Sequence, residues 1–134
     1  MTVGILLVTH PGIGTSVLHS ARRIIEDCPL NVMCQEVPVD TNLERITEAT
    51  KKLIEQLDQG DGVLVLTDIF GATPNNLARR FTEKGRIAVL AGLNLPMLVR
   101  VFNYPEADLK TLCETAVVGG ARGVHECRLP ETAE

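Results

Sequence analysis

Aromatic residues are scarce in this sequence, which has three Phe, one Tyr and no Trp among its 134 residues. Excess positive charge is missing as well, because the formal net charge is −4. Nucleic-acid-binding proteins present basic patches and stacking rings, so we expect no nucleic-acid partner. No apolar run approaches the roughly 20 residues that cross a bilayer, and no signal-like segment precedes the first apolar run. These absences favour a cytoplasmic protein.

Motifs for metals and common cofactors are also missing. Neither a C-x-x-C pair nor zinc-ligand spacing occurs among the four cysteines, Cys28, Cys34, Cys113 and Cys127. Three of them fall in apolar helix or strand patterns, which is typical of reduced core thiols. The other histidines, His19 and His125, do not stand at metal-binding helical spacing from His10. We expect neither a metal nor an organic cofactor.

Signatures of several enzyme classes are absent. The chain has no G-K-[ST] phosphate loop and no G-x-S-x-G motif, which excludes a P-loop ATPase and a serine hydrolase. Residues 12–17 resemble G-x-G-x-x-G, but the last glycine is missing and no acidic residue stands clearly at the end of the second strand. A dinucleotide site is therefore disfavoured. A small-ligand-binding protein of flavodoxin-like shape remains an alternative.

Five segments have the character of β-strands. Those at 3–8 and 87–91 are apolar throughout and 63–67 is apolar up to Thr67, as in strands buried on both faces, whereas 31–37 is mixed and nearer an edge. The last strand is predicted over 124–129. Helical periodicity between these segments is typical of an α/β fold: three layers, with a doubly wound, mainly parallel sheet and helices on both faces. Residues 1–130 form this single domain, and 131–134 form a loose tail.

Caps, prolines and glycines mark the predicted helix ends. The first helix carries an apolar stripe over 17–28. A capping box formed by Thr41 and Glu44 starts the second helix, and a Thr73 hydroxyl cap followed by Pro74 starts the third. Two prolines open the remaining helices and two glycines end the last one: Pro96, Pro105, Gly119 and Gly120.

Two of the predicted buried strands end in titratable side chains followed by glycine-containing turns. His10 follows the strand at 3–8, and Asp68 follows the strand at 63–67. In an open parallel sheet, ligands gather just outside the carboxyl ends of the strands. A neutral imidazole attacks through one ring nitrogen, while a carboxylate that accepts the proton of the other nitrogen fixes tautomer and orientation. We therefore interpret His10 as a covalent nucleophile and Asp68 as the group that orients it.

The turns beside these two residues are candidates for holding an anion. A helix N-terminus favours negative charge, so the Thr73 hydroxyl and the amides around it are suited to bind phosphate oxygens. We predict that Thr73, Gly71, Ala72 and Gly12 stabilise a phosphoryl group. Phosphoryl transfer depends mainly on positioning and charge neutralisation, so few further groups are needed.

Three segments together resemble a known family. They are the strand end Thr9-His10, the loop from Asp68 to Asn76, and the segment from Gly92 to Leu98. This pattern is similar to the mannose-type IIA component of the bacterial phosphoenolpyruvate-dependent sugar phosphotransferase system, and it covers nearly the whole chain in the right order. The chain departs from the family at Pro11, where glycine is usual, and at Ala72-Thr73, where Gly-Ser is common.

The resemblance implies a phosphotransferase component with a phosphohistidine intermediate. It implies that His10 accepts phosphate on Nε2 from the carrier HPr and passes it to a IIB component, with Asp68 bonded to Nδ1 and Thr73 nearby. It also implies a homodimer whose last strand, about residues 123–129, is exchanged between subunits, and membrane contact only through transporter subunits.

Two other roles fit the same histidine. In a regulatory phosphoprotein, the phosphorylation state of His10 would control binding to a target protein. In a relative of the IIA-like phosphocarrier that feeds dihydroxyacetone kinase, the phosphate would not pass to a sugar.

Overall fold

The computed structural model describes residues 2–82 and 85–130, and the predicted tail at 131–134 lies outside these residues. Within them, a four-stranded sheet is formed by β1 (Gly4–Thr9), β2 (Val32–Glu36), β3 (Val63–Thr67) and β4 (Ile87–Ala91). The strand order is β2-β1-β3-β4, and every pairing is parallel. The expectation of a mainly parallel sheet is confirmed.

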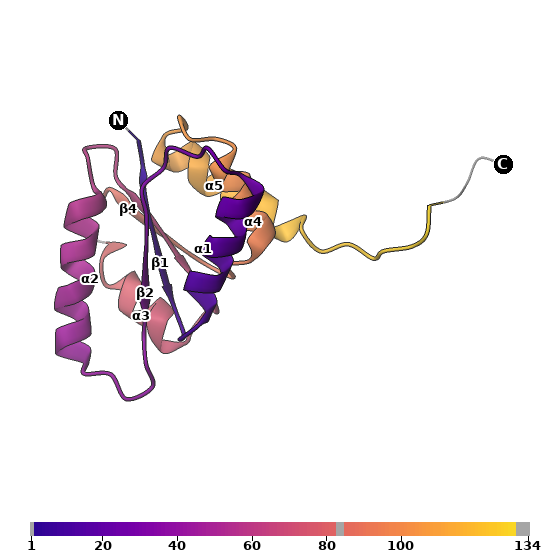
Figure 1. Ribbon diagram of the computed structural model, residues 1–134. Coiled ribbons are helices and arrows are strands. Elements are labelled where there is room, and N and C mark those ends of the chain that lie inside the picture. The colour runs from indigo at the N-terminus through magenta and orange to yellow at the C-terminus, as the bar shows by residue number, and fades with distance from the viewer. Residues whose placement is uncertain (1, 83–84, 131–134) are drawn as a thin grey trace.

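In the described part of the chain, five helices cover the two faces of the sheet (Figure 1). One face is covered by α1 (Ile13–Ile24), α4 (Leu95–Phe102) and α5 (Leu109–Ala121), and the other by α2 (Leu43–Leu57) and α3 (Thr73–Arg79). This arrangement confirms the three-layer, doubly wound fold. None of the helices described is both long and apolar enough to cross a membrane.

The central strands β1 and β3 are apolar up to their last residues, Thr9 and Thr67, because helices cover them from both sides. In β1, Ile5 and Leu7 point into the core beneath α1, α4 and α5, whereas Leu6 and Val8 point into the core beneath α2 and α3. Full burial of each such side chain contributes about 1.5–3 kcal/mol to folding. The edge strand β4 is less enclosed, and its residues 88–91 are only half-buried.

The four cysteines are free thiols. Cys28, Cys34 and Cys113 pack against the core beneath α1, α4 and α5, as expected, while Cys127 is exposed. Burial, reinforced by the nearby Glu36 carboxylate, raises the pKa of Cys34 to about 11. That thiol is therefore protonated and unreactive at neutral pH.

Two helix starts differ from those expected. The side chain of Asn42 caps α2 by accepting a 3.1 Å hydrogen bond from the Arg45 amide, so the predicted capping box of Thr41 and Glu44 is wrong. Asp108 caps α5 by accepting a 2.8 Å bond from the Thr111 amide, so this helix opens after Pro105 rather than at it. In both cases an Asn or Asp side chain directly before the helix provides the stronger cap.

Helix α5 also continues through the two glycines that were expected to end it. A Cβ atom on Gly119 would lie 2.5 Å from the Cβ of Arg100, and one on Gly120 would lie 2.8 Å from the Cε of Met97. Both glycines therefore face α4, where any side chain would clash. These glycines allow α4 and α5 to pack closely, and they do not end α5.

The strand predicted over 124–129 is not formed within the described residues. Residues 124–130 are instead exposed and extend away from the body of the protein after α5 (Figure 1). His125, expected in this strand, is exposed with them. A strand requires a hydrogen-bonding neighbour, and this segment does not fold back onto β4 of its own chain.

Candidate functional site

His10 and Asp68 lie where the order of the strands reverses. From β1 the chain moves outward to β2, and from β3 it moves outward to β4 on the other side. In open α/β sheets, such a switch point creates a crevice outside the carboxyl ends of the strands. His10 directly follows β1 and Asp68 directly follows β3, so the parallel pairing of these strands carries both residues to the same edge.

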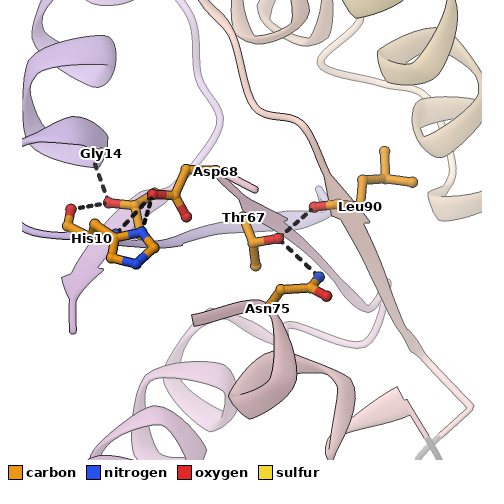
Figure 2. Close-up of polar contacts among 7 residues, drawn as sticks. His10, Gly14, Thr67, Asp68, Asn75 and Leu90 are labelled. Atoms are coloured by element: carbon orange, nitrogen blue, oxygen red, sulfur yellow. Dashed lines mark hydrogen bonds and ion pairs between the residues drawn. The ribbon is translucent and has the colours of Figure 1, made fainter. Parts of the chain in front are cut away.

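Asp68 contacts His10 through one carboxylate oxygen (Figure 2). Asp68 Oδ2 lies 2.7 Å from His10 Nδ1 and accepts a 3.0 Å hydrogen bond from the His10 backbone N–H. Since a carboxylate only accepts, the neutral imidazole carries its proton on Nδ1 and keeps a lone pair on Nε2. The contact thus creates one nucleophilic ring nitrogen and fixes the plane of the ring.

Burial differs sharply between the two partners. The His10 side chain is 39% exposed, whereas that of Asp68 is 7% exposed. Burial raises the pKa of Asp68, but hydrogen bonds from the His10 backbone and ring together outweigh burial and hold that pKa below its usual value. Asp68 is therefore ionised at neutral pH behind an accessible imidazole. Its second oxygen, Oδ1, is buried without a hydrogen bond in the part of the chain described.

Thr9 holds the turn that follows His10. Its hydroxyl donates a 2.8 Å hydrogen bond to the His10 carbonyl and accepts a 2.9 Å bond from the Gly14 amide at the start of α1. Between them, Gly12 has a φ of 86°, which glycine adopts without strain. This role of Thr9 was not predicted from the sequence, although a lone hydroxyl at the end of an apolar strand was an available signal.

Asn75 holds the turn that follows Asp68. Its amide nitrogen donates a 3.0 Å hydrogen bond to the Thr67 hydroxyl, which in turn donates to the Leu90 carbonyl at 3.2 Å (Figure 2). Its oxygen accepts a 3.1 Å bond from the Gly71 amide. The side chain is almost fully buried, so these bonds form in a shielded environment where they are strong. This residue was also missed.

The residues expected to hold a phosphoryl group lie on these two turns. Gly12 precedes α1, while Gly71, Ala72 and Thr73 lead into α3. The predicted Thr73 cap is wrong, because Thr73 is already the first helical residue and Ala72, at the cap position, makes no side-chain bond. Within the described residues, no hydrogen bond joins any of these four residues to His10 or Asp68. Their binding of phosphate stays a prediction.

Large apolar side chains are exposed on the same turns. Ile69 is 57% exposed and Phe70 is 75% exposed, and both directly follow Asp68. Ile13, just after the His10 turn, is exposed as well. The Arg79 guanidinium lies 6.0 Å from the centre of the Phe70 ring, within reach of a cation–π contact.

Within residues 2–82 and 85–130, no group of three or more His, Cys, Asp or Glu side chains could hold a metal ion.

The fold and the site define an open-sheet α/β protein with a histidine–aspartate pair at its switch point. The chain belongs to the EIIA-man family, because the family model described as "PTS system fructose IIA component" matches residues 4–117. The resemblance to mannose-type IIA components of the sugar phosphotransferase system is thereby confirmed.

Individual relatives agree with this assignment. The chain is 32% identical over 127 residues to the mannose-specific EIIAB component of Escherichia coli K12, an alignment that covers 92% of this chain and 39% of that protein. It is 39% identical over 69 residues to the fructose-specific EIIA component of Bacillus subtilis, covering 51% of this chain and 44% of that protein. The chain thus spans about two fifths of the length of these curated relatives.

A solved structure of the same kind has the same fold. The mannose/sorbose specific IIA subunit of the phosphotransferase system from Enterococcus faecalis superimposes with a TM-score of 0.84. The sequences are 24% identical, and the superposition covers 99% of this chain and 100% of that one. At this level of identity the likeness establishes the fold alone.

Proposed function

We propose that this protein is a cytoplasmic phosphocarrier of a sugar phosphotransferase system. His10 accepts a phosphoryl group from phospho-HPr and passes it to a IIB component, and the membrane is reached only through transporter subunits. The observation that carries the proposal is the 2.7 Å contact between His10 Nδ1 and Asp68 Oδ2. Membership of the EIIA-man family supports it.

The chemistry is an in-line displacement at phosphorus. The Nε2 lone pair of His10 forms a new N–P bond while the N–P bond to the donor imidazole breaks, and the donor ring takes up a proton from solvent. The His10 ring becomes positively charged as the bond forms. Its Nδ1–H already faces ionised Asp68, which offsets that charge without rearrangement.

The phosphoryl oxygens are proposed to lie against the two turns at this edge. The Thr73 hydroxyl is the first proposed donor, because it lies at the start of α3 and does not cap that helix. Gly71, Ala72 and Gly12 are proposed to contribute through their backbone. A helix N-terminus carries partial positive charge, which suits a phosphoryl dianion.

The exposed surface around His10 suits protein partners better than a small substrate. Ile69, Phe70 and Ile13 present apolar area beside a ring that is itself accessible. Apolar and aromatic residues of this kind are enriched in the centres of protein interfaces. HPr and the IIB component are the proposed occupants of this surface in turn.

A homodimer with an exchanged C-terminal strand is also proposed. Val124 and Leu129 are exposed on the segment that leaves the body, and β4 ends the sheet without a further neighbour in the described residues. A hollow of about 280 Å³ beside the end of β4 is lined partly by Met97 and Val117. Truncation after Gly123 is expected to yield monomers or unfolded protein, as measured by light scattering. A truncated protein that stays dimeric would disprove the exchange.

The deciding experiment is incubation with phosphoenolpyruvate, enzyme I and HPr. One acid-labile phosphate per chain is expected by mass spectrometry, followed by its loss when a IIB protein is added. A protein that takes up phosphate and keeps it in the presence of IIB proteins would instead act as the regulatory phosphoprotein. A protein that takes up none would contradict the proposal.

A further inference from the structure

Glu36 lies at the same edge of the sheet as His10, on the side opposite Asp68. It is the last residue of β2, so the expectation that no acidic residue stands at the end of the second strand is wrong. The Cα of Glu36 pairs with that of Thr9, the residue before His10. The next amide, that of Val37, donates a 2.8 Å hydrogen bond to the Thr9 carbonyl. The end of β1, which His10 follows, therefore lies between Glu36 at the end of β2 and Asp68 just after β3.

The Glu36 carboxylate holds the segment that follows His10. Its Oε2 accepts a 2.7 Å hydrogen bond from the Thr15 hydroxyl. This bond, and after it the approach of the Gly12 amide, lowers the pKa of Glu36 below its usual value. Glu36 is thus ionised at neutral pH and is bonded to the first turn of α1 through Thr15.

Helix α1 has no cap of its own. Gly12, at the cap position, offers no side chain, and the first turn contains no acidic residue. The N-terminus of a helix leaves amides unpaired and carries partial positive charge, which a carboxylate stabilises. Glu36 supplies that negative charge from the neighbouring strand. The Thr9 hydroxyl accepts a hydrogen bond from the Gly14 amide.

We propose that Glu36 is a positioning residue for phosphoryl transfer at His10. It holds residues 12–15 against the end of β2 and so keeps the turn after His10 in a single conformation, with Nε2 directed at the incoming phosphoryl group. This inference deepens the proposed function and rests on it. Asp68 fixes the ring of His10, whereas Glu36 fixes the turn on which the ring is carried.

The test compares Glu36→Ala and Glu36→Gln with a matched control, Asp108→Ala. Asp108 also caps a helix, through the Thr111 amide at 2.8 Å, but it does so at the opposite edge of the sheet, where Leu109 lies beside Gly62. Each alanine variant removes one carboxylate that accepts a hydrogen bond from the first turn of a helix, and each is expected to lower Tm. Only Glu36 adjoins the His10 turn.

Transfer rates from phospho-HPr are measured for all variants over a range of donor concentrations. Glu36→Ala is expected to lower kcat about tenfold with little change in KM, because a misplaced nucleophile reacts slowly once the donor is bound. Glu36→Gln is expected to restore most of the rate, since its amide oxygen can still accept from Thr15. Asp108→Ala is expected to leave kcat unchanged. If Glu36→Ala does not fold, Thr15→Val removes the same hydrogen bond and is expected to lower kcat less.

Hydrogen exchange of the Gly12 and Thr15 amides provides a readout that needs no phosphoryl donor. Exchange is expected to accelerate in Glu36→Ala and not in Asp108→Ala. The inference is overturned if folded Glu36→Ala keeps the wild-type kcat, or if Asp108→Ala loses as much. A wild type that takes up no phosphate overturns the proposed function itself, and faster exchange in Glu36→Ala then assigns Glu36 to stabilising the start of α1 alone.

Discussion

The turns after β1 and β3 leave the sheet side by side, yet they present opposite environments. The turn after β1 exposes His10 and is tied by the Thr9 hydroxyl to its own backbone. The turn after β3 buries Asp68 and is tied by Asn75, which reaches back from α3 to Thr67. The proposed function requires an accessible nucleophile, whereas a carboxylate that orients it acts best when shielded from water.

The two turns also differ in what anchors them. Asp68 contacts His10 through one oxygen, Oδ2, which accepts hydrogen bonds from the backbone amide and from the ring nitrogen Nδ1 of His10. His10 is therefore fixed at both its backbone and its ring by a neighbour 58 positions away in the sequence. We therefore expect substitutions in the His10 turn to change the rate of phosphoryl transfer most. Substitutions in the Asp68 turn are expected to change that rate through the position of His10.

The largest effect is expected from His10→Ala. Removal of the imidazole leaves no nucleophile, so uptake of acid-labile phosphate from phospho-HPr should fall to the background level. His19→Ala, at an exposed position on α1, is the control and should be phosphorylated like the wild type. Phosphate uptake by the His10 variant would place the acceptor elsewhere.

Asp68→Asn is expected to slow transfer on the order of 100-fold, in line with the loss of groups that orient a functional histidine. An amide removes the negative charge behind the ring and no longer favours the proton on Nδ1. The rate is measured by stopped-flow transfer from phospho-HPr, and the ring tautomer by ¹⁵N NMR. Asp58→Asn, at the other edge beside Arg86, should transfer normally. An unchanged rate in Asp68→Asn would remove the pair from the mechanism.

Thr9→Val and Thr67→Val sharpen the comparison between the two turns. Each removes a buried hydroxyl with two hydrogen bonds, so each should lower the free energy of unfolding by about 1–3 kcal/mol. Only Thr9 bonds to the His10 backbone directly, so Thr9→Val should slow transfer more than Thr67→Val. Thr9→Ser keeps the hydroxyl and should restore the rate. The reverse order of rates would show that the Asp68 turn governs reactivity.

The smallest effect expected is on stability against pH. The lowered pKa of Asp68 means that the ionised carboxylate stabilises the folded state. That contribution is fully present above the ordinary aspartate pKa of about 4 and is lost as the pH falls through the lower value of the folded protein. The difference in unfolding free energy between wild type and Asp68→Asn should therefore shrink below about pH 4. Denaturant titrations at stepwise pH measure it, and a difference that grows on acidification would contradict the assigned shift.

Much of the fold was predictable because its signals are local. Runs such as 63–66 are apolar throughout, and parallel strands covered on both sides need such runs. The His10 and Asp68 positions followed from a general rule about strand ends. Capping was less predictable, since Thr41 and Asn42 both carry suitable side chains and only the actual start of α2 selects Asn42. Gly119 and Gly120 were misassigned because their meaning depends on α4, which packs against them.

The sequence by itself determined the order of the elements, the apolar faces that bury them and the chemical identity of the two residues at the strand ends. These properties follow from side-chain type and spacing over a few residues. Only the tertiary structure decided that Asp68 Oδ2 meets His10 Nδ1, that Asn75 secures one turn and that Glu36 at the end of β2 accepts a hydrogen bond from Thr15 of α1. Such contacts depend on which strands become neighbours and in what register, and that choice is made by the whole core at once.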